Sequence, residues 1–253
     1  MNGKPLIWDL PTRICHWTFA LSLTASLAIG LTVDDGSPLF RLHMLFGLVA
    51  VFVLAVRLVL GVVGSRSARF TSFPLGPRSV VSYFRSVVLH ETRRPEFAGN
   101  NPGSALAAVA MFVLVPLIVL TGIGAGGEAF EDVHAVAAYA LLAVIGAHLL
   151  GIAVHTITRR ENIGAAMVTG RMAAPPAGEL RSARPFGGLI VALAIGAWCV
   201  ALYRGYDAGA GTVRVPLVGA TLRLGENEDD EKRSERGAEA GRDHKDRDDD
   251  DDD

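Results

Sequence analysis

Cysteine is scarce in this chain of 253 residues, and the motifs of several large enzyme classes are missing. The two cysteines, Cys15 and Cys199, form no pair motif, and the lack of a C-x-x-C-H run excludes covalent attachment of a c-type haem. The sequence also has no H-E-x-x-H motif of zinc proteases and no glycine-rich nucleotide-binding loop. The usual signatures of hydrolases and of nucleotide-binding enzymes are therefore absent.

A formal net charge of −2 hides an uneven distribution of charge along the chain. Residues 226–253 carry 15 of the 26 acidic side chains but only 6 of the 24 basic ones, so the rest of the chain is basic. Half of all residues are hydrophobic, and the mean hydropathy is +0.35. We interpret the body as a basic membrane domain and the C-terminal segment as an acidic, soluble tail.

Five apolar stretches are long enough to cross a bilayer. A span needs about 17–25 mostly apolar residues, and in lipid it must be helical to satisfy its own backbone hydrogen bonds. The predicted spans are residues 17–33, 42–63, 104–123, 133–154 and 186–203. The sequence therefore predicts an all-α integral membrane protein.

Arginines are concentrated in the second and fourth connections between these spans, whereas the first and third connections carry aspartate and glutamate. By the positive-inside rule, this pattern predicts a multi-pass protein of the bacterial inner membrane with a cytoplasmic N-terminus and a periplasmic tail. We expect no cleaved signal peptide, because Trp8, Asp9 and His16 interrupt the first apolar run and no small-residue cleavage site precedes Asp34. Cleavage would remove His16.

Five histidines lie in or at the edges of the apolar stretches: His16, His43, His134, His148 and His155. Ionisable residues inside a membrane indicate a functional site. The order of the crossings places His43 and His134 near the outer face, and His16 and His148 nearer the cytoplasm. Each pair is suited to hold the iron of a haem b between two imidazoles, which predicts two non-covalent haems.

The spacing of the histidines on the fourth span supports this pairing. His134 and His148 are fourteen residues apart, on one helix face and about 21 Å apart along the axis. His155 shares the face, but with it in place of His148 the irons would be about 31 Å apart, across the whole hydrocarbon core. We therefore assign His148 as the ligand, and His155 as a quinone or proton contact or an interfacial residue.

Three arginines are further candidates for cofactor binding. Arg57 lies on the same helical stripe as His43, and it either contacts a haem propionate or a quinone, or snorkels to the inner headgroups. Arg13, beside His16, and Arg41, beside His43, are candidates of the same kind.

Small residues near the histidines are the last candidates. Gly47 follows His43 by one turn, and Gly30 follows His16 by two heptads. They either make room for a flat macrocycle or serve the helix packing that small residues commonly support in membranes.

Six segments of the sequence together resemble one family. They read WDLPTRICHW, LHMLFG, GSRSARF, NNPGSALA, VHAVAAYALLAVIGAHLLGIAVH and RRENIGAAMVTGRM. This pattern, over about residues 5–172, is similar to the bacterial cytochrome b561 family, which includes the b-type cytochrome subunit of nickel-iron hydrogenases. The resemblance implies haem ligands at His16, His43, His134 and His148. The fifth span and the acidic tail depart from a minimal four-helix member.

The expected fold is thus a four-helix transmembrane haem-binding bundle with a fifth transmembrane helix and a disordered acidic tail. We divide the chain into a di-haem domain at 1–172, a connection and fifth helix at 173–204, and an extracytoplasmic, largely disordered tail at 205–253.

Haem with two histidine ligands has no open site for oxygen and is suited to passing electrons. The leading hypothesis is a cytochrome linking the membrane quinone pool to a periplasmic redox partner, such as a c-type cytochrome. We expect no catalytic residue and no nucleic-acid partner. The alternatives are a superoxide:quinone oxidoreductase, which would be an enzyme, and a non-redox carrier whose histidines relay protons.

Three further segments carry predictions of their own. Residues 77–90 predict an amphipathic helix that either lies in the membrane interface with its arginines toward anionic headgroups or has no partner. Residues 211–225 alternate in part and predict a short hairpin. Residues 226–253 are too polar to fold, and they either steer a basic redox protein or only aid solubility.

Overall fold

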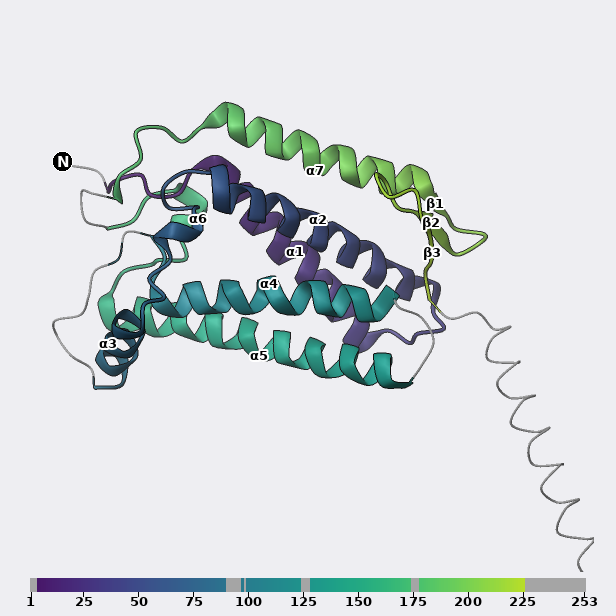
Figure 1. Cartoon of the computed structure of the whole chain (residues 1–253), viewed down its shortest axis with the longest axis horizontal. Helices are drawn as coiled ribbons and strands as arrows, with labels where there is room; N and C mark the ends of the chain where they lie inside the picture. Colours follow the sequence, from purple (N-terminus) through teal and green to yellow (C-terminus); the bar gives the residue numbers. More distant parts are fainter. Residues whose placement is uncertain (1–3, 90–96, 98, 124–127, 174–177, 226–253) are drawn as a thin grey trace, which may run out of the picture. The chain divides into compact units, whose positions relative to one another are not determined.

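The computed structural model describes residues 4–89, 97, 99–123, 128–173 and 178–225 (Figure 1). The chain forms two compact units. One consists of Met1–Thr24 and Gly47–Val200, and the other of Ala25–Phe46 and Ala201–Asp253. The acidic tail lies outside the described residues, and both its disorder and the predicted domain boundaries stay predictions.

Among the described residues, five helices are long and apolar enough to cross a membrane. They are α1 (Leu10–Thr32), α2 (Arg41–Val63), α4 (Pro102–Ile123), α5 (Glu128–Arg159) and α7 (Pro185–Gly205). The five predicted spans and the all-α membrane fold are confirmed. α5 extends beyond its predicted span at both ends, because polar residues continue the helix past the apolar stretch.

α1 begins at Leu10 rather than at residue 17, because Asp9 caps it. The Asp9 carboxylate accepts a hydrogen bond from the backbone N–H of Thr12 at 3.2 Å, which satisfies one of the unpaired donors at a helix start. Pro11 fits the first turn, where its missing N–H is not needed. His16 is consequently inside the helix.

Within the first unit, α7 packs against α1 and α2. A buried apolar cluster joins these three helices and consists of Cys15, Val53, Val191 and Ile195. The rings of Phe52 and Trp198 stack with centroids 4.4 Å apart, and the Trp198 indole N–H donates to the carbonyl of Leu48 at 3.2 Å. A buried tryptophan with its N–H bonded fixes α7 against α2.

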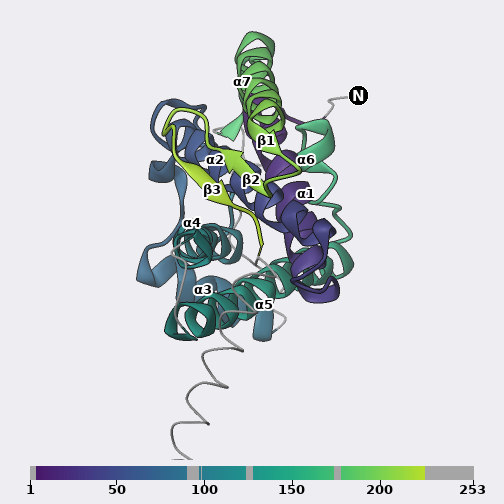
Figure 2. The same ribbon diagram turned by 90° about the vertical axis from the view of Figure 1, so that its right-hand side faces the viewer.

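α4 and α5 lie side by side in both views of the first unit (Figures 1 and 2). The short helix α3 (Pro77–Val88) contacts α4 and confirms the helix predicted after the second span. A single turn, α6 (Ala166–Thr169), follows α5. Two 3-10 turns, Pro38–Phe40 and Phe70–Ser72, flank α2.

The second unit contains a three-stranded antiparallel sheet (Figure 2). Its strands are β1 (Tyr206–Asp207), β2 (Thr212–Arg214) and β3 (Thr221–Arg223), in that order. Val213 of β2 is paired with Leu222 of β3, so the predicted hairpin is confirmed. β1 follows α7 directly and was not predicted.

Candidate haem-binding site

His43, in the first turn of α2, is held by the C-terminal part of α1. Its Nδ1 lies 2.8 Å from the carbonyl oxygen of Ser26, and the Ser26 hydroxyl donates to the His43 carbonyl at 2.9 Å. The ring of Phe40 stacks on the imidazole at 5.1 Å. A carbonyl only accepts, so Nδ1 carries the proton and Nε2 carries the lone pair, which is the tautomer that binds iron.

Gly30 completes the surroundings of His43. A Cβ atom at Gly30 would lie 2.8 Å from Nδ1 and 2.9 Å from Cε1 of His43, so no other residue fits there without displacing the ring. Ser26 and Gly30 are four residues apart, on one face of α1. The space at Gly30 is thus taken by the imidazole of His43 and not by a macrocycle.

His134, near the start of α5, has the same surroundings, built from α4. Its Nδ1 lies 2.9 Å from the carbonyl oxygen of Ile118 and 3.4 Å from Oγ1 of Thr121. A Cβ atom at Gly122 would lie 2.9 Å from Cε1 of His134. Ile118 and Gly122 again differ by four residues. The two histidines, on different helices, therefore have the same kind of surroundings. Each has its own peptide carbonyl, hydroxyl and glycine, and each has the lone pair on Nε2.

The other two candidate ligands lie within the first unit. His16 of α1 and His148 of α5 are both half-buried and are close enough to interact electrostatically. The structure thus brings this pair together. Their role as ligands of one haem stays a prediction, as does the pairing of His43 with His134, which belong to different units.

Arg57 of α2 is near enough to His16 to interact with it electrostatically. Its guanidinium carbon is 5.8 Å from the ring centroid of Phe70 and 5.9 Å from that of Phe112, within the range of cation–π contacts. In the part of the chain that the structure describes, its Nη1 is buried without a hydrogen-bond partner. Because an unmade hydrogen bond of a buried cation is unfavourable, this donor fits a propionate or quinone oxygen.

Arg13 contacts the backbone of α6. Its guanidinium donates to the carbonyls of Met167, at 3.4 Å from Nε, and Val168, while the indole N–H of Trp17 donates to Met167 at 2.9 Å. These bonds pair carbonyls at the end of a helix, which lack partners within it. Arg13 therefore joins α1 to the segment after α5, and its cofactor role stays a prediction.

Arg41 also bonds to a carbonyl. Its Nη1 donates to the carbonyl of Ala208 in the β1–β2 turn at 2.7 Å, and the guanidinium lies against Gly211. The predicted contact of Arg41 with a cofactor is neither supported nor opposed by these bonds. Gly47 is half-buried on α2, and its assignment stays a prediction as well.

His155, near the end of α5, has its Nε2 atom 3.8 Å from a carboxylate oxygen of Glu161. Glu161 also lies 3.9 Å from the ammonium group of Lys4. Charged neighbours of this kind suit a residue at the membrane interface, and they leave His148 as the better candidate for iron.

The histidine nitrogens of this site fit the iron of a haem better than a metal ion that is bound by protein side chains alone. Across the described segments, no group of three or more His, Cys, Asp or Glu side chains is arranged to hold a metal ion. Protein-bound zinc or non-haem iron needs such a group, whereas haem needs only two axial ligands. Histidines with the proton on Nδ1 and the lone pair on Nε2 supply that type of ligand.

Five membrane-crossing helices and oriented histidines are features of one class of proteins, the multi-pass membrane cytochromes. The model of the prokaryotic cytochrome b561 family matches residues 7–170, and the chain belongs to this family. No curated protein and no solved structure matches the chain. The family match confirms the resemblance seen in the sequence. It shows a membrane protein of a family that binds b-type haem and transfers electrons, with α7 outside the match.

Proposed function

We propose that the protein is a di-haem cytochrome that passes electrons across the membrane between the quinone pool and a redox partner on the periplasmic face. The observation that carries the proposal is the common setting of His43 and His134, each with Nδ1 on a peptide carbonyl and the lone pair on Nε2. The membrane is the bacterial inner membrane, with the N-terminus in the cytoplasm, as the arginine-rich connections favour.

In this proposal, His43 and His134 hold one haem near the outer face, and His16 and His148 hold a second nearer the cytoplasm. α5 gives one ligand to each site, about 21 Å apart along its axis. A bound haem supplies a one-electron iron couple. The four histidines would hold the two haems, and the hydrogen bonds of His43 to the Ser26 carbonyl and of His134 to the Ile118 carbonyl fix the orientation of the two outer imidazoles.

Anaerobic mixing with a quinol tests this function. The protein in liposomes should be reduced by a ubiquinol or menaquinol analogue, seen as growth of the reduced haem absorption band, and reoxidised by a soluble c-type cytochrome. Reduction by dithionite but not by either quinol would refute the quinone role. Much faster reduction by superoxide than by quinol would favour the superoxide:quinone oxidoreductase.

Arg57→Gln is expected to lower the midpoint potential of the inner haem. A cation favours the reduced iron, and at an effective dielectric constant of about 20 and a separation of about 10 Å its loss is worth about 1–2 kcal/mol, or roughly 50–100 mV. A potentiometric titration measures the shift. Arg57→Lys, which keeps the charge, is the control and should have the potential of the parent protein. Equal potentials in Arg57→Gln and the parent protein would refute the cofactor contact and favour an arginine that reaches the lipid headgroups.

Removal of residues 226–253 is expected to slow electron transfer to a basic periplasmic cytochrome at low salt. The tail carries 15 acidic side chains, whose attraction is screened over about 10 Å at 0.1 M salt. Stopped-flow rates at low and high ionic strength measure the effect, which should vanish at high salt. A truncated protein with both haems and an unchanged low-salt rate would limit the tail to solubility.

A further inference from the structure

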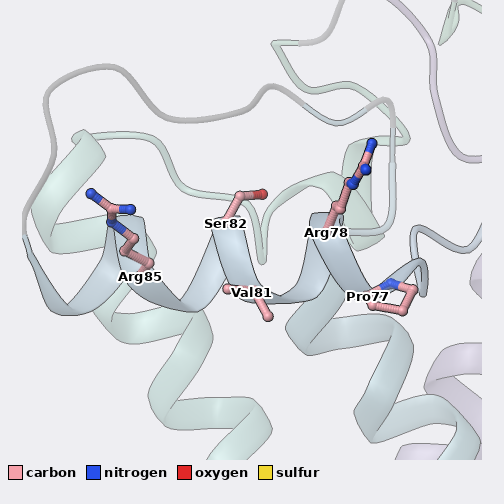
Figure 3. Close-up of a pocket in the computed structure, with 5 residues that line it drawn as sticks. All are labelled: Pro77, Arg78, Val81, Ser82 and Arg85. Atoms are coloured by element: carbon pink, nitrogen blue, oxygen red, sulfur yellow. The ribbon is translucent and has the colours of Figure 1, made fainter.

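α3 has an exposed face that the electron-transfer proposal does not use. The residues on this face are Arg78, Val81, Ser82, Phe84 and Arg85, and Leu89 follows at the C-cap of the helix. The apolar ones are well exposed, at 66% for Val81, 45% for Phe84 and 58% for Leu89. Arg78, Ser82 and Arg85 project from the same side of the helix, where they line a shallow depression (Figure 3). α3 contains no acidic residue.

The opposite face of α3 is fixed to α4. The ring of Tyr83 lies so close to Gly103 that a Cβ atom there would be 3.3 Å from it, and Tyr83 meets Phe97 edge-on at 6.1 Å. The buried Ser86 hydroxyl donates to the carbonyl of Tyr83 at 2.7 Å. Gly103 is the second residue of a membrane-crossing helix. α3 is therefore held at the depth where α4 enters the bilayer, which is the depth of the lipid headgroups.

At this depth, the chemistry of the exposed face matches one ligand. A helix in the interface places apolar side chains in the acyl boundary and arginines at anionic headgroups. Guanidinium groups bind phosphate with two parallel hydrogen bonds. The Ser82 hydroxyl already donates to the carbonyl of Ser79 at 3.1 Å, so its contribution is its small size, which leaves space between the two arginines.

We propose that the exposed face of α3 is a binding site for anionic phospholipids, with Arg78 and Arg85 on the lipid phosphates and with Val81 and Phe84 in the acyl boundary. The proposal is independent of the number of haems and of the quinone. It assigns a role to the amphipathic helix between α2 and α4 that holding a haem does not require.

A fluorescent probe on α3 tests the site. Val81→Cys is labelled with an environment-sensitive dye in a Cys199→Ser background, since Cys199 is exposed and Cys15 is buried. The full chain is placed in phosphatidylcholine nanodiscs with increasing phosphatidylglycerol. The emission should shift to shorter wavelength as phosphatidylglycerol rises. Arg78→Gln/Arg85→Gln should weaken this response about 30-fold, at about fivefold for each arginine near an anionic surface.

Matched variants make the outcome decisive. Arg214→Gln/Arg223→Gln removes the same charge from the β-sheet and should respond like the parent, and Arg78→Lys/Arg85→Lys should recover part of the response. Equal haem content in every variant shows that folding is intact. An emission maximum that is the same in pure phosphatidylcholine as in nanodiscs with phosphatidylglycerol would overturn the proposal. So would inorganic phosphate that reproduces the shift without anionic lipid, because the ligand would then be a soluble anion.

Discussion

His148→Ala is expected to lower the haem content of the purified protein from two haems per chain to one, and His16→Ala is expected to do the same. In the proposed arrangement, each change would remove one of the two imidazoles that hold the inner haem. The haem that remains should be the outer one. A pyridine haemochrome assay against protein concentration gives the ratio, and a redox titration shows which of two potentials is lost.

Two sets of variants control this result. His43→Ala and His134→Ala should also leave one haem, but with the other potential retained. His155→Ala should keep both haems, because its imidazole faces Glu161 at 3.8 Å. If His155→Ala removed a haem while His148→Ala kept two, the ligand assignment on α5 would be wrong.

A single methyl group at Gly30 or at Gly122 is expected to remove the outer haem. In Gly30→Ala, the new Cβ would lie 2.8 Å from Nδ1 of His43, and in Gly122→Ala it would lie 2.9 Å from Cε1 of His134. The imidazole must then leave the carbonyl that fixes its tautomer, so both its direction and its protonated nitrogen change. Haem content and the low-temperature absorption spectrum report the loss.

Gly146→Ala is the matched control for these two variants. Gly146 lies on α5, the helix of His134 and His148, and no atom would lie within 4 Å of its added Cβ. Alanine stabilises a helix interior by about 1 kcal/mol relative to glycine, so a loss of haem at Gly30 or Gly122 cannot come from helix propensity. Retention of both haems in Gly30→Ala, with an unchanged spectrum, would refute the proposed role of the glycine.

The membrane-crossing helices were predictable because length and hydropathy alone decide whether a segment crosses lipid. The residues at which these helices begin and end were harder to predict. α1 begins at Leu10 because the Asp9 carboxylate accepts the Thr12 N–H, and a hydropathy scan counts Asp9 only as a charge. β1 has two residues, Tyr206 and Asp207, and exists only through its pairing with β2, so no local pattern indicates it.

The candidate ligands could be found from sequence because histidine is rare and conspicuous in apolar segments. Their partners could not, since the acceptor at His43 and at His134 is a peptide carbonyl, which every residue has. The only sequence signal of these surroundings is a glycine, Gly30 or Gly122, four positions after the residue whose carbonyl is the acceptor. The cofactor contacts of Arg13 and Arg41, inferred from their neighbours in sequence, stay predictions. The sequence could not show that these long side chains reach carbonyls of distant segments.

The bonds from Arg13 and Trp17 to the backbone of α6 bear on the speed of electron transfer. They tie the start of α1, which carries His16, to the segment that follows α5, which carries His148. When iron changes oxidation state, ligands on a loose scaffold would move and raise the reorganisation energy. Preorganised groups need little rearrangement at the moment of reaction. At the proposed inner site, this cross-link would keep His16 and His148 in place through the backbone of α6 and would so favour rapid electron exchange.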